Sequence, residues 1–125
     1  MKDSRVYLDL IISACDKIAA FISDLDASAF ERDEKTQSAV IMQLHVIGEE
    51  AKKLDAATQA DIDMPWEKII AQRNLISHQY FALELPLIWE TATTDVPRLA
   101  TALREYLHAK GSEYIPPFDN AEPLL

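Results

Sequence analysis

Apolar residues recur every three to four positions through four long stretches of this chain, with polar residues between them. Because an α-helix turns by about 100° per residue, this spacing gathers the apolar side chains on one face. The pattern predicts four amphipathic helices, which cover residues 4–25, 33–54, 65–78 and 84–110. Each apolar face needs a neighbour to pack against, so we expect the helices to form a bundle.

The second predicted helix has two apolar stripes. The main stripe runs from Val40 to Leu54, and a narrower one contains Ile41, His45 and Gly48. Two stripes predict two neighbours, one of which lies either in the same chain or in another subunit. A glycine inside a helix costs about 1 kcal/mol relative to alanine, so we expect Gly48 to permit a close approach of two helices.

Prolines and a glycine mark the helix boundaries. Pro65 fits the first position of the third helix, where a backbone N–H is not needed. Pro97 lies inside the pattern of the fourth helix and predicts a kink near residues 93–94. Gly111 is expected to end that helix. The connectors, residues 24–32 and 55–64, each have room for one short helical turn.

The composition agrees with one helical domain. Of the 125 residues, 49% are apolar and 26% are charged, which suits a globular chain with a single core. Two glycines leave little material for the turns of an all-β fold. We therefore predict an all-α fold in which residues 1–110 form an antiparallel bundle of four to five helices. Residues 111–125, which contain three prolines, are predicted to form an extended tail.

Net charge and cysteine content restrict the partners and the compartment. The formal net charge of −9 disfavours extended non-specific binding to nucleic acid, although a small basic cleft is compatible with it. The single Cys15 cannot form an internal disulfide, which fits a reducing compartment. No run of about 18 apolar residues is present, and the first residues do not resemble a signal peptide. These features predict a cytoplasmic protein without membrane association.

Residues 73–80 contain the densest group of side chains able to act on a phosphate: Arg73, Asn74, Ser77, His78 and Tyr80. The third apolar pattern ends within this octet, so part of it is expected to be exposed. On a helix, Asn74 and His78 share one face, whereas Arg73 and Ser77 share another. Arg73 and His78 are five residues apart, so they converge only if the helix ends or loosens near His78.

These residue types suit RNA cleavage without a metal ion. Such a reaction needs a base for the 2′-hydroxyl proton, an acid for the leaving 5′-oxygen, and a cation for the charged phosphorane. Imidazole suits both proton transfers because its pKa lies near neutrality, and guanidinium suits the phosphate because it is forked and permanently charged. One histidine supplies one proton-transfer group only. A two-fold dimer that joins two copies of the third helix supplies two.

The octet, written as Arg-x4-His-x-Tyr, resembles the signature of HepT-like toxins in the HEPN superfamily. Further segments have similar residues in the same order, and the resemblance covers roughly residues 4–107, leaving the tail outside. These segments are Asp33–Thr36, Ile47–Leu54, Pro65–Trp66 and Ile88–Glu90.

The resemblance implies a helical bundle that forms a homodimer, or a higher oligomer, with a composite ribonuclease cleft near the motif. It implies a toxin that is paired with a minimal nucleotidyltransferase antitoxin, which transfers AMP from ATP onto the motif tyrosine, here Tyr80. Carried over to this chain, His78 is the acid or base, Arg73 the phosphate clamp, and Asn74 a polar orienter. The substrate is RNA, and neither a cofactor nor a metal ion is implied.

Two other classes of function are open. One is a non-catalytic subunit that docks a small nucleotidyltransferase and binds nucleotide or phosphate through Arg73 and His78. The other is a plain oligomeric scaffold. The spacing alone predicts only that Arg73 pairs with a carboxylate and that His78 caps a helix C-terminus.

Residues outside the octet have simpler interpretations. His45 and Glu49 have a spacing that suits a metal ion, but a solvated or interface pair explains it as well. Glu49 and Glu50 are interpreted as a solvated face or the rim of a dimer, and Cys15 as part of the core.

Overall fold

A computed structural model of the chain describes residues 4–79 and 83–111. Within these residues the protein is helical and has no strand, so the predicted all-α, HEPN-like fold is confirmed. The elements, in order, are α1 (Ser4–Ile22), α2 (Ala27–Glu31), α3 (Glu34–Lys52), α4 (Ala56–Asp61), α5 (Trp66–Gln79), α6 (Leu85–Glu90), the π-helical segment η2 (Thr91–Asp95) and α7 (Val96–Ala109).

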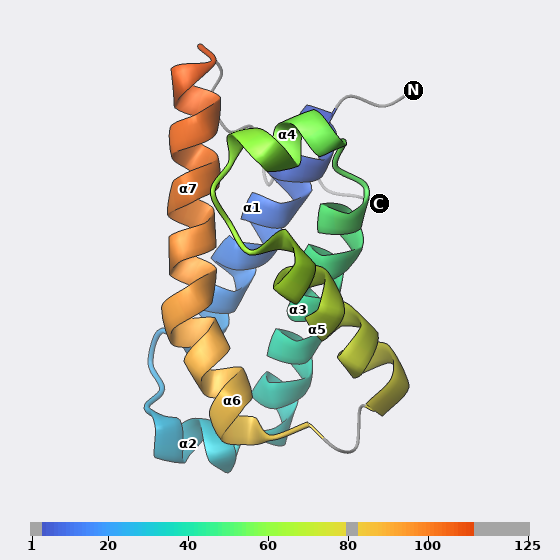
Figure 1. Cartoon of the computed structure of the whole chain (residues 1–125). Coiled ribbons are helices and arrows are strands. Elements are labelled where there is room, and N and C mark those ends of the chain that lie inside the picture. Colours follow the sequence, from blue (N-terminus) through green and yellow to red (C-terminus); the bar gives the residue numbers. More distant parts are fainter. Residues whose placement is uncertain (1–3, 80–82, 112–125) are drawn as a thin grey trace, which may run out of the picture.

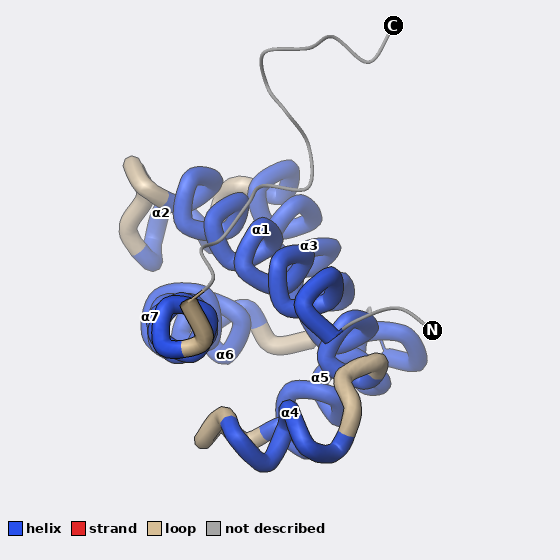
Figure 2. Tube along the Cα trace, turned by 90° about the horizontal axis from the view of Figure 1, so that it is seen from above, coloured by secondary structure: helices blue, strands red, loops and turns tan. Residues whose placement is uncertain are grey.

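The long helices alternate in direction. In Figure 1, α1 runs downward, α3 upward, α5 downward, and the run α6–η2–α7 upward again. Seen from above, α1 and α3 lie side by side, and α7 and α5 lie on the other side of the molecule (Figure 2). The short helices α2 and α4 make the connections at the two ends. Because α3 packs against both α1 and α5, its two apolar stripes each have a neighbour in the same chain.

The apolar stripes meet in one core. The largest of its side chains that are 0–1% exposed come from several helices: Leu8, Ile11, Ile12 and Ile18 of α1, Phe30 of α2, Val40 of α3, and Leu103 of α7. Removing this apolar surface from water is the main force that holds the helices together. The ring of Phe30 also packs against that of Trp89, with 5.1 Å between ring centroids.

Aspartates define the starts of three helices. Each accepts a hydrogen bond from the backbone N–H three residues later, which supplies a partner for an otherwise unpaired group at the helix start. The N···O distances are 2.8 Å for Asp26, 3.0 Å for Asp33 and 2.7 Å for Asp55. The predicted helical turns in both connectors are thereby confirmed as α2 and α4.

The fourth predicted helix is interrupted where Pro97 disturbs it. The chain changes from α-helix to π-helix at Thr91–Asp95 before α7 begins, and the ribbon bends there (Figure 1). Proline lacks an N–H and its ring collides with the preceding turn, so a regular α-helix cannot pass this point. The hydroxyl of Thr91 donates to the carbonyl of Leu87 at 2.9 Å, and that of Thr93 donates to Trp89 at 2.8 Å.

Other boundaries differ slightly from the prediction. α1 ends at Ile22 rather than at residue 25, and α5 begins at Trp66, one residue after Pro65. Ile69 and Ile70 are only half-buried, because α5 lies at the edge of the bundle. Gly111 follows α7 with φ of 73°, a left-handed conformation that glycine adopts without strain.

The predicted tail beyond Gly111 lies outside the described residues. In the part of the chain that the structure covers, no helix is long and apolar enough to span a membrane.

Candidate functional site

Helix α5 presents the central motif near its C-terminal end. The helix stays regular through His78 and ends at Gln79. Ile76 is buried and anchors this last part of α5 to the core, whereas Asn74 and His78 are exposed. Arg73 is half-buried and directed towards α3, the helix beside it. Tyr80 lies outside the described residues.

Gly48 of α3 lies directly beneath the stem of Arg73. A Cβ atom added to Gly48 would overlap the Cβ of Arg73, and it would lie 3.0 Å from its Cγ and 3.3 Å from its Cα. Gly48 is therefore required for the close approach of α3 and α5, as predicted. The contact places the arginine stem against a backbone surface that has no side chain of its own.

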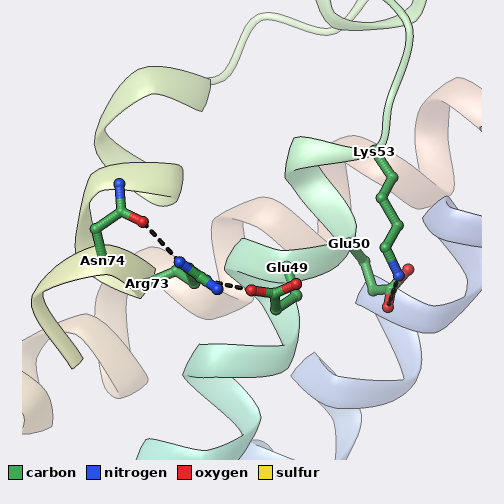
Figure 3. A network of polar contacts seen from close by, with 5 residues as sticks. All are labelled: Glu49, Glu50, Lys53, Arg73 and Asn74. Carbon is green, nitrogen blue, oxygen red and sulfur yellow. Dashed lines mark hydrogen bonds and ion pairs between the residues drawn. The ribbon is translucent and has the colours of Figure 1, made fainter. Parts of the chain in front are cut away.

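The guanidinium of Arg73 has two partners. Its Nε donates to Oε1 of Glu49 on α3, and its Nη1 donates to Oδ1 of Asn74 at 2.9 Å (Figure 3). The side chain of Arg73 is 24% exposed and that of Glu49 is 34% exposed, so the pair is partly shielded but open on one side. The pairing of Arg73 with a carboxylate, predicted from spacing alone, is thus present.

Sequence reasoning missed Glu49 as the partner of Arg73. Both Glu49 and Glu50 were interpreted alike, yet the structure separates them. Glu50 pairs at 3.2 Å with Lys53, the residue just after α3, whereas Glu49 reaches across to α5. The available signal was the position of Glu49 beside Gly48, the residue predicted to face a close neighbour.

His78 shares its helical face with Asn74. The two residues are four apart in a regular helix and both are exposed. Around the helix axis, the Cβ of Arg73 lies about 140° from that of His78, because five residues of α-helix turn by about 500°. The predicted condition for Arg73 and His78 to converge is therefore not met within one chain, and the hydrogen bond to Asn74 is what links the guanidinium to a residue of the His78 face.

Large apolar side chains are exposed around the motif. Leu75 on α5 is 41% exposed and Met42 on α3 is 59% exposed. The exposed surface of the α3–α5 pair therefore combines polar motif residues with unpartnered apolar ones.

A cleft of about 500 Å³ lies elsewhere, between the start of α5 and α7, and Ile47, Lys68, Gln72, Arg98 and Leu99 are among the residues that line it. Arg73, Asn74 and His78 do not line it. Among the described residues, no group of three or more His, Cys, Asp or Glu is placed to hold a metal ion.

Cys15 is a core residue. It is 2% exposed, and burial raises the pKa of its thiol to about 12. A thiol of this kind is not a nucleophile near neutral pH.

Comparisons with known proteins identify the family. Residues 11–106 match the family described as "Ribonuclease HepT-like". A protein of Thermococcus cleftensis named "Probable ribonuclease HepT" is 32% identical over 99 residues, which are 78% of this chain and 90% of that protein.

Two other relatives are each named "Putative RNase". One, from Methanocaldococcus jannaschii, is 32% identical over 107 residues, covering 85% of this chain and 88% of its own. The other, from Caldanaerobacter subterraneus subsp. tengcongensis, is 29% identical over 108 residues, covering 86% and 96%. No solved structure matches. The matched segment spans most of the helical bundle and includes the whole α3–α5 pair, and the chain accordingly belongs to the HepT-like ribonuclease family.

Proposed function

We propose that this protein is a metal-independent endoribonuclease toxin of the cytoplasm. It cuts RNA as a homodimer and is silenced by a minimal nucleotidyltransferase antitoxin that transfers AMP to Tyr80. Membership of a ribonuclease family supports the reaction class. The observation that carries the proposal is the Arg73 guanidinium, which is held by Glu49 and by Asn74, the residue that shares a helical face with His78.

The chemistry follows from these side chains. A neutral imidazole takes the proton of the 2′-hydroxyl, whose oxygen attacks the adjacent phosphorus. The bond from phosphorus to the 5′-oxygen breaks, and a protonated imidazole gives that oxygen a proton. The products are a 2′,3′-cyclic phosphate and a 5′-hydroxyl. Arg73 donates to the non-bridging oxygens, where negative charge gathers in the transition state.

Two chains are needed because each supplies one His78. A two-fold axis beside the exposed surface of α3 and α5 brings both histidines and both arginines to one phosphate. The exposed side chains of Leu75 and Met42 support this location, because an apolar surface gains free energy when a second copy covers it.

AMP on Tyr80 explains the silencing electrostatically. The added phosphate lies two residues from His78 in sequence, carries negative charge, and competes with RNA phosphate for Arg73. In the proposed organisation, residues 1–110 form the catalytic bundle and residues 111–125 form a separate tail.

The central test is RNA cleavage in EDTA by the wild type, His78→Ala and His108→Ala. His108 is a matched control, because it is an exposed histidine in the last turn of α7. We expect the wild type and His108→Ala to cut equally, and His78→Ala to be slower by about 100-fold or more. Equal cleavage by His78→Ala contradicts the proposal. So does a wild type that neither cuts RNA nor is toxic on expression.

A second candidate function is favoured by the net charge of −9, which gives an RNA substrate little general attraction. Here the bundle is a non-catalytic subunit that docks the nucleotidyltransferase and binds nucleotide phosphate through Arg73 and His78. This function predicts nucleotide binding without RNA cleavage at any protein concentration.

The modification is tested by intact-mass measurement. The wild type, Tyr80→Phe and Tyr106→Phe are incubated with ATP and a minimal nucleotidyltransferase as the candidate antitoxin. Tyr106 is a half-buried tyrosine of α7 and serves as the control. An AMP-sized increase in the wild type and Tyr106→Phe, but not in Tyr80→Phe, supports Tyr80 as the target. An increase in all three contradicts it.

A further inference from the structure

The neighbouring carboxylates Glu49 and Glu50 at the end of α3 have ion-pair partners in different parts of the fold. Glu50 pairs with Lys53, the residue that follows α3, whereas the carboxylate of Glu49 crosses to α5 and accepts from Nε of Arg73 (Figure 3). The two residues are 24 positions apart in the chain. The contact therefore fixes a side chain on one helix from the surface of another.

The contact determines which donors of Arg73 remain available. A guanidinium has five N–H donors in a rigid plane. Glu49 takes the one on Nε, and Asn74 takes one of the two on Nη1. Within the part of the chain that the structure describes, the remaining Nη1 donor and both Nη2 donors are left for an anion, and the plane in which they lie is set by the two partners. The stem that carries the guanidinium lies against the backbone of Gly48.

We propose that Glu49 is a positioning residue for Arg73. It holds the guanidinium plane so that the free donors face the scissile phosphate, and it does not touch the substrate itself. This inference rests on the proposed ribonuclease function and adds a residue to its site. The benefit arises in the transition state, where donors that are already oriented need no rearrangement as charge develops.

The negative charge of Glu49 weakens RNA binding, whereas its contact with Arg73 favours the transition state. A carboxylate beside Arg73 lowers the local positive potential and so weakens ground-state attraction of RNA. Removing Glu49 is therefore expected to lower kcat without raising KM for RNA. A residue that only stabilises the fold changes the unfolding temperature and leaves both constants unchanged well below that temperature.

The experiment compares Glu49→Ala, Glu49→Gln and Glu49→Asp with the wild type in RNA cleavage. Glu49→Gln keeps an oxygen acceptor at the same reach, whereas aspartate is one methylene shorter. We expect kcat to fall by about 10-fold to 100-fold in Glu49→Ala and Glu49→Asp, with KM unchanged or lower. Glu49→Gln is expected to recover most of kcat. The control is Glu50→Gln, which removes the same charge from the adjacent position and leaves kcat unchanged.

A second measurement uses Arg73→Lys. The lysine ammonium is a compact point charge with no plane to orient. In this background, Glu49→Ala is expected to change kcat by about two-fold at most, which isolates the coupling between the two residues.

The outcomes separate this inference from the function on which it rests. If the wild type cuts RNA but Glu49→Ala keeps the wild-type kcat, the positioning role is wrong and the ribonuclease function stands. Equal kcat values for Glu49→Gln and Glu49→Ala, both with lower KM, also contradict the positioning role, because they show that Glu49 acts only through its charge. If the wild type does not cut RNA, the function and the inference fail together.

Discussion

The stem of Arg73 lies on the bare backbone of Gly48. A methyl group at that position would overlap the Cβ of Arg73, an atom that no change of rotamer can move. Relief therefore requires α3 and α5 to separate. The same contact that lets the two helices approach also sets the height of the arginine above α3, where Glu49 meets it.

Gly48→Ala is consequently expected to destabilise the protein. Alanine gains about 1 kcal/mol of helix propensity, whereas overpacking costs about 1–3 kcal/mol, and the immobile Cβ of Arg73 places this site at the upper end. The net loss is expected to be about 2 kcal/mol in the free energy of unfolding, measured with urea. In an Arg73→Gly background, which removes the opposing Cβ and Cγ but leaves the Cα at 3.3 Å, the same change is expected to be much less destabilising. Stabilisation in both backgrounds contradicts the contact.

The composite cleft predicts an unusual response to mixed dimers. If both copies of His78 serve one phosphate, a dimer of one wild-type chain and one His78→Ala chain is inactive. After subunits are allowed to exchange, cleavage activity is expected to fall as the square of the wild-type fraction. Two independent sites per dimer give a linear fall instead. His108→Ala, mixed in the same proportions, is expected to leave activity constant.

If Leu75 is covered in the homodimer, a charged residue at this position is expected to disrupt the dimer. Leu75→Glu places two carboxylates near each other across a two-fold axis, where water is excluded. We expect a monomer in light scattering after gel filtration, together with loss of cleavage. Val6→Glu is the matched control, since Val6 on α1 is 42% exposed and Leu75 is 41% exposed. If Leu75→Glu remains a dimer and keeps its activity, the interface lies elsewhere.

Cys15 predicts a loss of stability in alkaline solution. Burial, assisted by the charge of Asp16, raises the pKa of its thiol from 9.0 to about 12. Above pH 9 the unfolded chain loses this proton while the folded protein keeps it, so the free energy of unfolding falls as the pH rises from 9 towards 12. By pH 10 the contribution of Cys15 to this fall is about 1.4 kcal/mol.

The comparison with Cys15→Ala isolates that contribution from other groups that titrate. The variant is less stable than the wild type at pH 7, because it leaves a small cavity in the core. The difference between the two proteins is expected to shrink by about 1.4 kcal/mol between pH 7 and pH 10. A constant difference means that the thiol titrates normally in the folded protein.

Much of the helical fold was predictable because its signals are local. The spacing of apolar residues located α1, α3, α5 and α7, and the aspartates before α2, α3 and α4 act on backbone groups three residues away. Pro97 indicated the interruption at Thr91–Asp95 for the same reason, because its missing N–H affects only the preceding turn. Boundaries such as Ile22 were less certain, since helix ends depend on what covers them.

The motif was recognisable by its residue types, but its geometry was not. Spacing placed Asn74 and His78 on one face of α5, and both are exposed there. The direction of Arg73 depended on a hydrogen bond to Asn74 and an ion pair with Glu49, of which only the first joins neighbours in sequence.

By itself, the sequence determined which segments are helical, which faces they bury, and which residues carry the candidate chemistry, because these properties arise within a few residues of the chain. Tertiary structure alone decided that Glu49 rather than Glu50 meets Arg73. That choice depends on the register and distance at which α3 packs against α5. The close fit at Gly48 fixes both, and it arises from steric contact between segments that are far apart in sequence.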